Sequence, residues 1–169
     1  NKPYFAVSPV DFWRRWHISL STWLKDYLYI PLGGNKKGNR ILYQNLLVVM
    51  ILGGLWHGAS WNFVIWGLLH GTYLVIYRII SSKIPIKNKN KSKLVTIIGI
   101  LITQYFVFLA WIPFRVQDLD LITYSMWKYV FWDFQYLKTL DFINSHEISI
   151  GLVAIFLILN FISYKTNIV

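Results

Sequence analysis

The stretch Gly53-Gly54-Leu55-Trp56-His57-Gly58-Ala59-Ser60-Trp61 lies inside a segment, residues 41–77, that contains no Asp, Glu, Lys or Arg. A run of that length without charge is typical of a chain that lies in lipid. His57 stands near the middle of this run. An ionisable side chain is costly to keep at membrane depth, so its presence favours a functional role.

The composition of the whole chain indicates a membrane protein. The 169 residues are 56% hydrophobic and 18% aromatic, with a mean hydropathy of +0.45, which is too apolar for an ordinary soluble domain. The formal charge of +10 is gathered between the apolar runs, where Lys and Arg fix orientation toward the cytoplasmic leaflet. We therefore expect no nucleic-acid partner. There are no cysteines, which excludes disulfides and thiolate ligands.

Residues 8–40 are expected to form an interfacial amphipathic helix followed by a basic turn. Ser8-Pro9-Val10-Asp11 is typical of a helix start, with a capping serine, proline at the first helical position and a carboxylate that can reach back. From Phe12 to Tyr27 the apolar residues recur at helical period, opposite a basic face. Because hydroxyl residues weaken a helix, any break is expected within Ser19–Thr22. Residues 31–40 are rich in glycine and basic side chains, which indicates a turn outside hydrocarbon.

Four apolar segments follow, and we interpret residues 1–169 as a single membrane domain that is a fragment of a longer protein. The segments are residues 41–55, 61–77, 94–114 and 148–164. Residues 41–80 are expected to form a hairpin that carries His57, while 94–114 and 148–164 are expected to be further transmembrane helices. The lysines between 83 and 93, with no acidic residue among them, predict a cytoplasmic loop. The mixed charges of 115–147 predict the opposite side.

Two glycine patterns occur in the hairpin, Gly54–Gly58 and Gly67–Gly71, each with histidine before its second glycine. Small residues at this spacing let membrane helices approach closely. The pattern alone is common in apolar helices, so it predicts close packing and no specific chemistry.

His57 has two interpretations that the residues alone leave open, a catalytic base or a structural hydrogen-bonder between helices. The flanking glycines leave space for a substrate, and Trp56 and Trp61 can wall an apolar pocket. Burial in such surroundings disfavours the imidazolium, which keeps the ring able to accept a proton. His17 is the second candidate, with an interfacial hydrogen bond as its plainer role.

The remaining polar residues fit less demanding roles. We expect His70 to pack between helices and His146 to be solvated. No histidine pair has the spacing of helix-borne zinc ligands, so no metal is expected. Arg14 and Arg15 belong to a basic patch beside the predicted pocket. Such a patch can hold the phosphates of coenzyme A or bind anionic lipid, and anionic lipid is the commoner ligand of such patches.

Three long motifs in this chain resemble a known family. They are Asp11-Phe12-Trp13-Arg14-Arg15-Trp16-His17-Ile18-Ser19-Leu20-Ser21-Thr22-Trp23-Leu24, then Asp26-Tyr27-Leu28-Tyr29-Ile30-Pro31-Leu32-Gly33-Gly34-Asn35, then residues 53–61, with Leu109–Arg115 as a later element. Together they resemble the membrane-bound O-acyltransferase (MBOAT) family, in particular its alginate O-acetyltransferase-like branch, over residues 1 to about 128. The resemblance implies an all-α, multi-pass transmembrane protein of which this chain is the C-terminal part.

The resemblance also implies a reaction and its residues. The family's catalytic histidine corresponds to His57, and its second polar position, which is Asn, Asp or His depending on the branch, corresponds to His17. We expect Trp56, Trp61, Arg14 and Arg15 to contact substrate. The implied reaction is acyl transfer from a thioester, supplied by acetyl-CoA or an acyl carrier protein on the cytoplasmic side, to a hydroxyl, with no permanently bound cofactor.

The sequence thus predicts an O-acyltransferase of the bacterial inner membrane that serves exopolysaccharide acetylation of the alginate type. Its acceptor would be a polysaccharide or an extracytoplasmic partner protein that receives the acetyl group. Two alternatives stay open: teichoic-acid D-alanyl transfer or lipid or protein acylation by the same chemistry, and a non-catalytic transporter subunit whose histidines relay protons.

Overall fold

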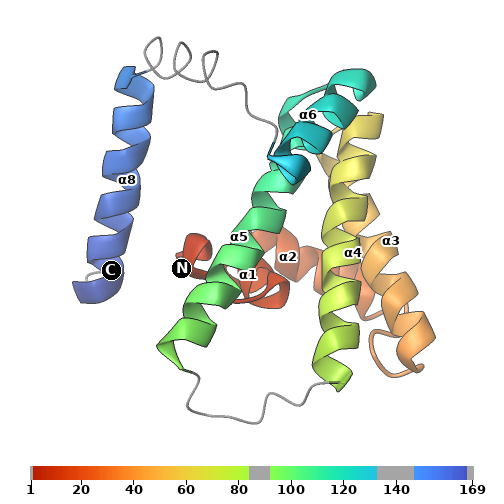
Figure 1. Cartoon of the computed structure of the whole chain (residues 1–169). Coiled ribbons are helices and arrows are strands. Elements are labelled where there is room, and N and C mark those ends of the chain that lie inside the picture. Colours follow the sequence, from red (N-terminus) through yellow and green to blue (C-terminus); the bar gives the residue numbers. More distant parts are fainter. Residues whose placement is uncertain (1, 84–91, 133–146, 167–169) are drawn as a thin grey trace. The chain divides into compact units, whose positions relative to one another are not determined.

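A computed structural model describes residues 2–83, 92–132 and 147–166. Within these ranges all regular structure is helical (Figure 1), which confirms the all-α prediction. The elements are η1 (Pro3–Phe5), α1 (Pro9–Arg15), α2 (Ile18–Leu24), η2 (Lys25–Tyr29), α3 (Asn39–His57), α4 (Trp61–Lys83), α5 (Lys93–Arg115), α6 (Leu119–Phe131) and α8 (Glu147–Thr166).

The chain divides into two compact units, Pro3–Trp127 and Lys128–Val169. The first contains everything that positions the predicted site, and the second contains helix α8. His146 and most of the predicted lysine loop, at 84–91, lie outside the described residues.

Helix α1 begins as the sequence predicts. The hydroxyl of Ser8 accepts a hydrogen bond from the backbone N–H of Asp11 at 3.1 Å, and Pro9 occupies the first helical position. The Asp11 carboxylate accepts from the backbone N–H of Val7 at 3.1 Å and from Nε of Arg15 at 2.9 Å. These bonds satisfy donors that a helix start leaves open, and they fix the direction in which the chain enters α1.

The structure has two short α-helices and a π-helical turn where the sequence predicts an amphipathic helix that is weakest at Ser19–Thr22. The break falls at Trp16 and His17 rather than within Ser19–Thr22, which forms the middle of α2. His17 has a left-handed backbone, with φ of 42°. The carbonyl of Trp16, released by the break, accepts a hydrogen bond from the hydroxyl of Ser21 at 3.2 Å.

The break lets the two halves reach different partners. Phe12 of α1 packs in a buried cluster with Ala6 and with Val107 of α5. Leu20 and Leu24 of α2 pack in a separate buried cluster with Val49 of α3. One straight helix presents a single apolar stripe. Burial against two neighbours therefore outweighs the local cost of the left-handed residue.

Glycines shape the turn before α3. Gly33 and Gly34 have positive φ angles of 105° and 53°, a region that glycine enters without steric cost. The buried side chain of Asn45 on α3 donates from Nδ2 to the carbonyl of Leu32 at 3.3 Å and to that of Gly34 at 3.1 Å. The turn is thus tied to α3 by one amide.

Helices α3 and α4 pack backbone against backbone (Figure 1). A Cβ atom at Gly54 would collide with the carbonyl of Phe63 on α4, and one at Gly67 would collide with the carbonyl of Met50 on α3. A Cβ at Gly71 would lie 3.1 Å from the Cα of Leu47. This confirms that the small residues permit a close approach.

Helices α4 and α5 have the length and composition of membrane spans. Each has 23 residues, about 34 Å at the rise of an α-helix, against a hydrocarbon core of about 30 Å. Helix α3 has 19 residues because it begins at the polar Asn39, before the apolar run. Helix α5 covers residues 94–114, where the sequence predicts a span, and contains Pro113 in its last turn.

Replacement of Gly67 by alanine tests the close approach. Helix propensity alone would make the alanine variant more stable by up to about 1 kcal/mol. The collision with Met50 should outweigh this gain and lower the free energy of unfolding by about 1–3 kcal/mol. Gly151→Ala in α8 is the matched control, because nothing lies within 4 Å of its added Cβ. Thermal unfolding of the full-length protein in detergent measures both. Equal midpoints for the two variants would contradict the packing described.

Candidate functional site

His57 is the last residue of α3 and lies in a cup of aromatic rings. Its ring centroid is 5.0 Å from that of Trp56, 5.2 Å from that of Trp66 and 5.0 Å from that of Phe114. Phe63 lies farther away, at 6.1 Å. These rings come from α3, α4 and α5, so three helices fix the position of the imidazole.

The imidazole of His57 remains partly exposed, and neither of its nitrogens has a hydrogen-bond partner among the residues that the structure describes. Partial exposure distinguishes His57 from His70, which is buried between helices. Because aromatic rings surround the His57 imidazole without bonding to its nitrogens, the imidazole is available to an external ligand.

His17 lies beside His57, although 40 positions separate them in the sequence. The two ring centroids are 6.4 Å apart, and the ring of His17 lies 5.9 Å from that of Trp56. The left-handed backbone of His17 turns the chain between α1 and α2, which brings this exposed side chain to the end of α3. A strained residue at such a point is a feature of functional sites.

His70 is buried, as predicted for a packing residue, at 2% exposure. Its ring stacks on Phe12 of α1 at 6.1 Å with planes 7° apart, and it meets the edges of Trp13 at 5.1 Å and Trp66 at 4.7 Å. Since Trp66 also contacts His57, His70 supports one wall of the aromatic cup.

Asn62 contributes to the site, and the sequence analysis did not identify it. This residue in the first turn of α4 is 1% exposed and donates from Nδ2 to the carbonyl of Pro113 at 3.1 Å. The bond joins the start of α4 to the last turn of α5, where the next residue is Phe114. Asn62 thereby holds Phe114 against His57. A local pattern could not reveal a contact across 51 positions.

The other predicted site residues lie in different settings. The ring of Trp56 makes edge-to-face contacts with both histidine rings. Trp61, at the start of α4, is 70% exposed. Arg15 is bound to Asp11, and Arg14 lines a separate cavity described below. No group of acidic and histidine side chains suited to a metal occurs among the described residues.

Replacement of His17 by glycine tests whether its backbone is strained. A left-handed residue other than glycine costs roughly 1–2 kcal/mol, so His17→Gly should unfold at or above the temperature of the unchanged protein. His17→Ala, which also removes the ring but keeps a Cβ, should be less stable than the glycine variant by about 1 kcal/mol. Thermal unfolding in detergent compares the two. Equal stability would show that this position needs no left-handed residue.

The geometry defines a helical membrane protein with two histidine rings side by side at the end of a tightly packed hairpin. The model of MBOAT, the membrane-bound O-acyltransferase family, matches residues 1–114, and the chain belongs to this family.

Several bacterial proteins are similar to this chain. It is 50% identical over 120 residues to the peptidoglycan O-acetyltransferase of Helicobacter pylori, which covers 71% of this chain and 22% of that protein. It is 40% identical over 170 residues to the probable alginate O-acetylase AlgI of Pseudomonas aeruginosa, with coverage of 98% and 31%. It is 33% identical over 115 residues to the teichoic acid D-alanyltransferase of Bacillus subtilis, with coverage of 63% and 29%. The chain thus spans less than a third of the length of these relatives.

Proposed function

We propose that the protein containing this chain is an O-acetyltransferase that moves an acetyl group from a thioester donor to hydroxyls of a polysaccharide outside the cytoplasm. The observation that carries the proposal is the pairing of His57 with His17, with ring centroids 6.4 Å apart, inside an aromatic cup. Relatives named as O-acetylases of alginate and O-acetyltransferases of peptidoglycan support this class of acceptor. An alginate-type exopolysaccharide remains the acceptor we favour.

His57 acts as the general base in this proposal. A nitrogen of His57 takes the proton of the acceptor hydroxyl while its oxygen attacks the thioester carbonyl. The carbon–sulfur bond then breaks, and the thiolate takes the proton from the imidazolium, so an ester and a free thiol leave the site. No covalent enzyme intermediate is needed.

The neighbouring residues position the reactants. His17 is close enough to share one bound ester with His57, and we assign it a hydrogen bond to donor or acceptor. Trp56 lies against both histidine rings, and we assign it a contact with the bound substrate. We expect the exposed Trp61 to contact the acceptor. Asn62 is a positioning residue, because it acts through Phe114.

The same proposal includes a donor, an acceptor and a location in the cell. The donor is a cytoplasmic acyl thioester, either acetyl-CoA or an acyl carrier protein, and the acceptor is a polysaccharide or a protein that carries the acetyl group outside the cytoplasm. The protein would cross the inner membrane of a bacterium several times. Helices α4 and α5, long and apolar enough to span a membrane, support this location.

The same chemistry would serve a D-alanyl group in place of acetyl. The teichoic acid D-alanyltransferase of Bacillus subtilis shares 33% identity with this chain, which favours that alternative over a transporter. Mass analysis of the product polymer distinguishes the two acyl groups directly.

Replacement of His57 by glutamine tests the proposed base. The side chain stays neutral and of similar size but cannot take a proton, so acetylation of polysaccharide should fall by about 10²- to 10⁴-fold. Acetyl ester content of polymer from cells that express the full-length variant provides the measurement, with protein amount checked in the membrane fraction.

His146→Gln is the matched control, since the sequence places this histidine in a polar stretch away from the motifs. It should leave acetylation unchanged. Normal ester content in the His57→Gln strain would refute the role of His57 as base.

A further inference from the structure

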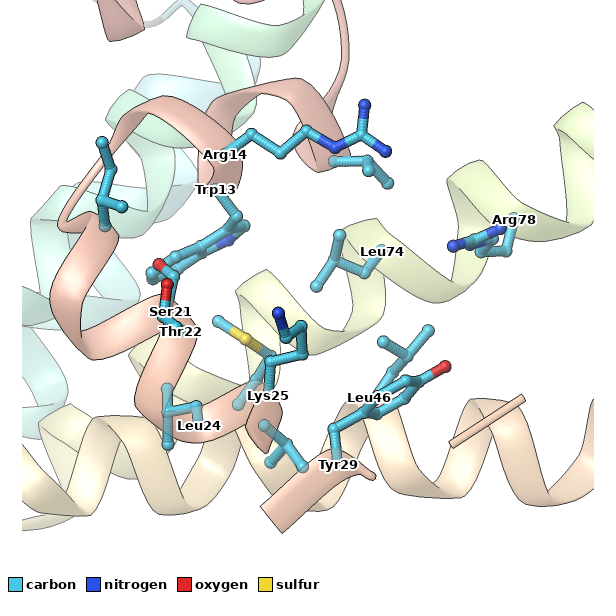
Figure 2. A pocket seen from close by; sticks show the side chains of 14 residues that line it. Trp13, Arg14, Ser21, Thr22, Leu24, Lys25, Tyr29, Leu46, Leu74 and Arg78 are labelled. Atoms are coloured by element: carbon cyan, nitrogen blue, oxygen red, sulfur yellow. The ribbon is translucent and has the colours of Figure 1, made fainter. Parts of the chain in front are cut away.

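A second site is suggested by a cavity whose lining does not include His57 or His17. Its volume is about 440 Å³, within the range of small-molecule pockets. It lies between α1, α2 and η2 on one side and α3 and α4 on the other. Figure 2 shows the charged ends of Arg14, Lys25 and Arg78 around this space, with Leu74 between them.

The cavity has a strong positive charge. Arg14, Lys25 and Arg78 line it, and no acidic residue does. Lys25 has an exposed partner, Asp26, at 3.1 Å, whereas neither arginine forms an ion pair within the described parts of the chain. Three cations that share one space with a single nearby acid are suited to an anion, because guanidinium groups bind phosphate oxygens with paired hydrogen bonds.

Tyr29 adds a neutral donor to the same wall. Burial raises the pKa of its phenol above the ordinary value, and the positive charge of Arg78 acts weakly in the other direction. The hydroxyl is therefore protonated at neutral pH and can donate to an anion. The hydroxyls of Ser21 and Thr22 also line the cavity.

The rest of the lining is apolar and lies deeper along the helices. On α4, Leu74 precedes Arg78 by one helical turn, which places it about 6 Å farther from Lys83, the last residue of the helix. On α3, Val49 and Met50 follow Leu46 by about one helical turn. Because α3 and α4 run antiparallel, they too lie farther from the Lys83 end of α4 than Leu46 does. Along α3 and α4 the lining thus becomes apolar with distance from the Lys83 end of α4.

This gradient matches a molecule with a phosphate at one end and hydrocarbon at the other. The neighbouring surface of α2 and η2 exposes Trp23 and Tyr27, which stack at 5.6 Å. Exposed aromatic residues of this kind mark the level of lipid headgroups. A membrane lipid reaches that level without leaving the bilayer and can also fill the apolar part of the cavity, whereas a soluble phosphate can contact only the charged and hydroxyl residues.

We propose that this cavity binds an anionic phospholipid, with its phosphate held among Arg14, Lys25 and Arg78 and part of an acyl chain along Leu74, Val49 and Met50. The site is independent of the proposed acetyl transfer, because the histidines do not line it. Bound lipid would join α1 and α2 to the α3–α4 hairpin through charge as well as through packing.

Lipid-dependent stabilisation of the full-length protein tests this site. Detergent-purified protein is titrated with phosphatidylglycerol, with phosphatidylcholine, and with inorganic phosphate, and thermal unfolding is recorded. We expect phosphatidylglycerol to raise the midpoint and the other two to have little effect. Arg78→Gln should weaken the apparent phosphatidylglycerol affinity about fivefold, the amount expected for one charge near an anionic headgroup.

Lys83→Gln is the matched control, since it removes one charge from the same helix outside the cavity. Its affinity for phosphatidylglycerol should stay within twofold of the unchanged protein. The site would be overturned if Arg78→Gln and Lys83→Gln lost the same amount of affinity for phosphatidylglycerol. It would also be overturned if phosphatidylglycerol and phosphatidylcholine raised the unfolding midpoint equally. Stabilisation by inorganic phosphate alone would overturn the assignment to lipid. Binding is read without any acetylation assay, so its failure leaves the role of His57 untouched.

Discussion

The contact on which the rest of this structure depends is the backbone approach of α3 and α4. Gly54 on α3 faces the carbonyl of Phe63, and Gly67 on α4 faces the carbonyl of Met50, with no room for a side chain at either glycine. In a membrane, helices gain little from hydrophobic burial against one another, so van der Waals contact at such surfaces provides much of their association. The contact sets the register of the hairpin.

That register decides what surrounds His57. With α3 ending at His57 and α4 starting at Trp61, the close approach places the rings of Phe63 and Trp66 against the imidazole. The bond from Asn62 to Pro113 then brings α5 to the same place. The site is thus formed by three helices, of which α3 and α4 meet through backbone contact and α5 is held by the side-chain amide of Asn62.

Much of this arrangement could be predicted from the sequence, and the parts that could not share one cause. The cap at Ser8, the apolar runs and the glycine contacts depend on neighbouring residues or on helical spacing, and all are found. The break at His17 and the bond from Asn62 to Pro113 depend on partners far along the chain. The hydroxyl residues suggested a break within Ser19–Thr22, whereas it falls at Trp16 and His17, because tertiary packing outweighs local helix propensity. The proximity of His17 to His57 followed only from the family resemblance.

The left-handed backbone of His17 limits which side chains evolution can place there. Among residues with a Cβ, asparagine, aspartate and histidine are several-fold enriched at positive φ, whereas branched and bulky residues are outliers. These are also the three residues that the family resemblance implies at this position. The choice of polar group would then be restricted first by the fold and only afterwards by the reaction, so that a residue such as glutamine, although chemically similar to asparagine, would be disfavoured by the turn itself.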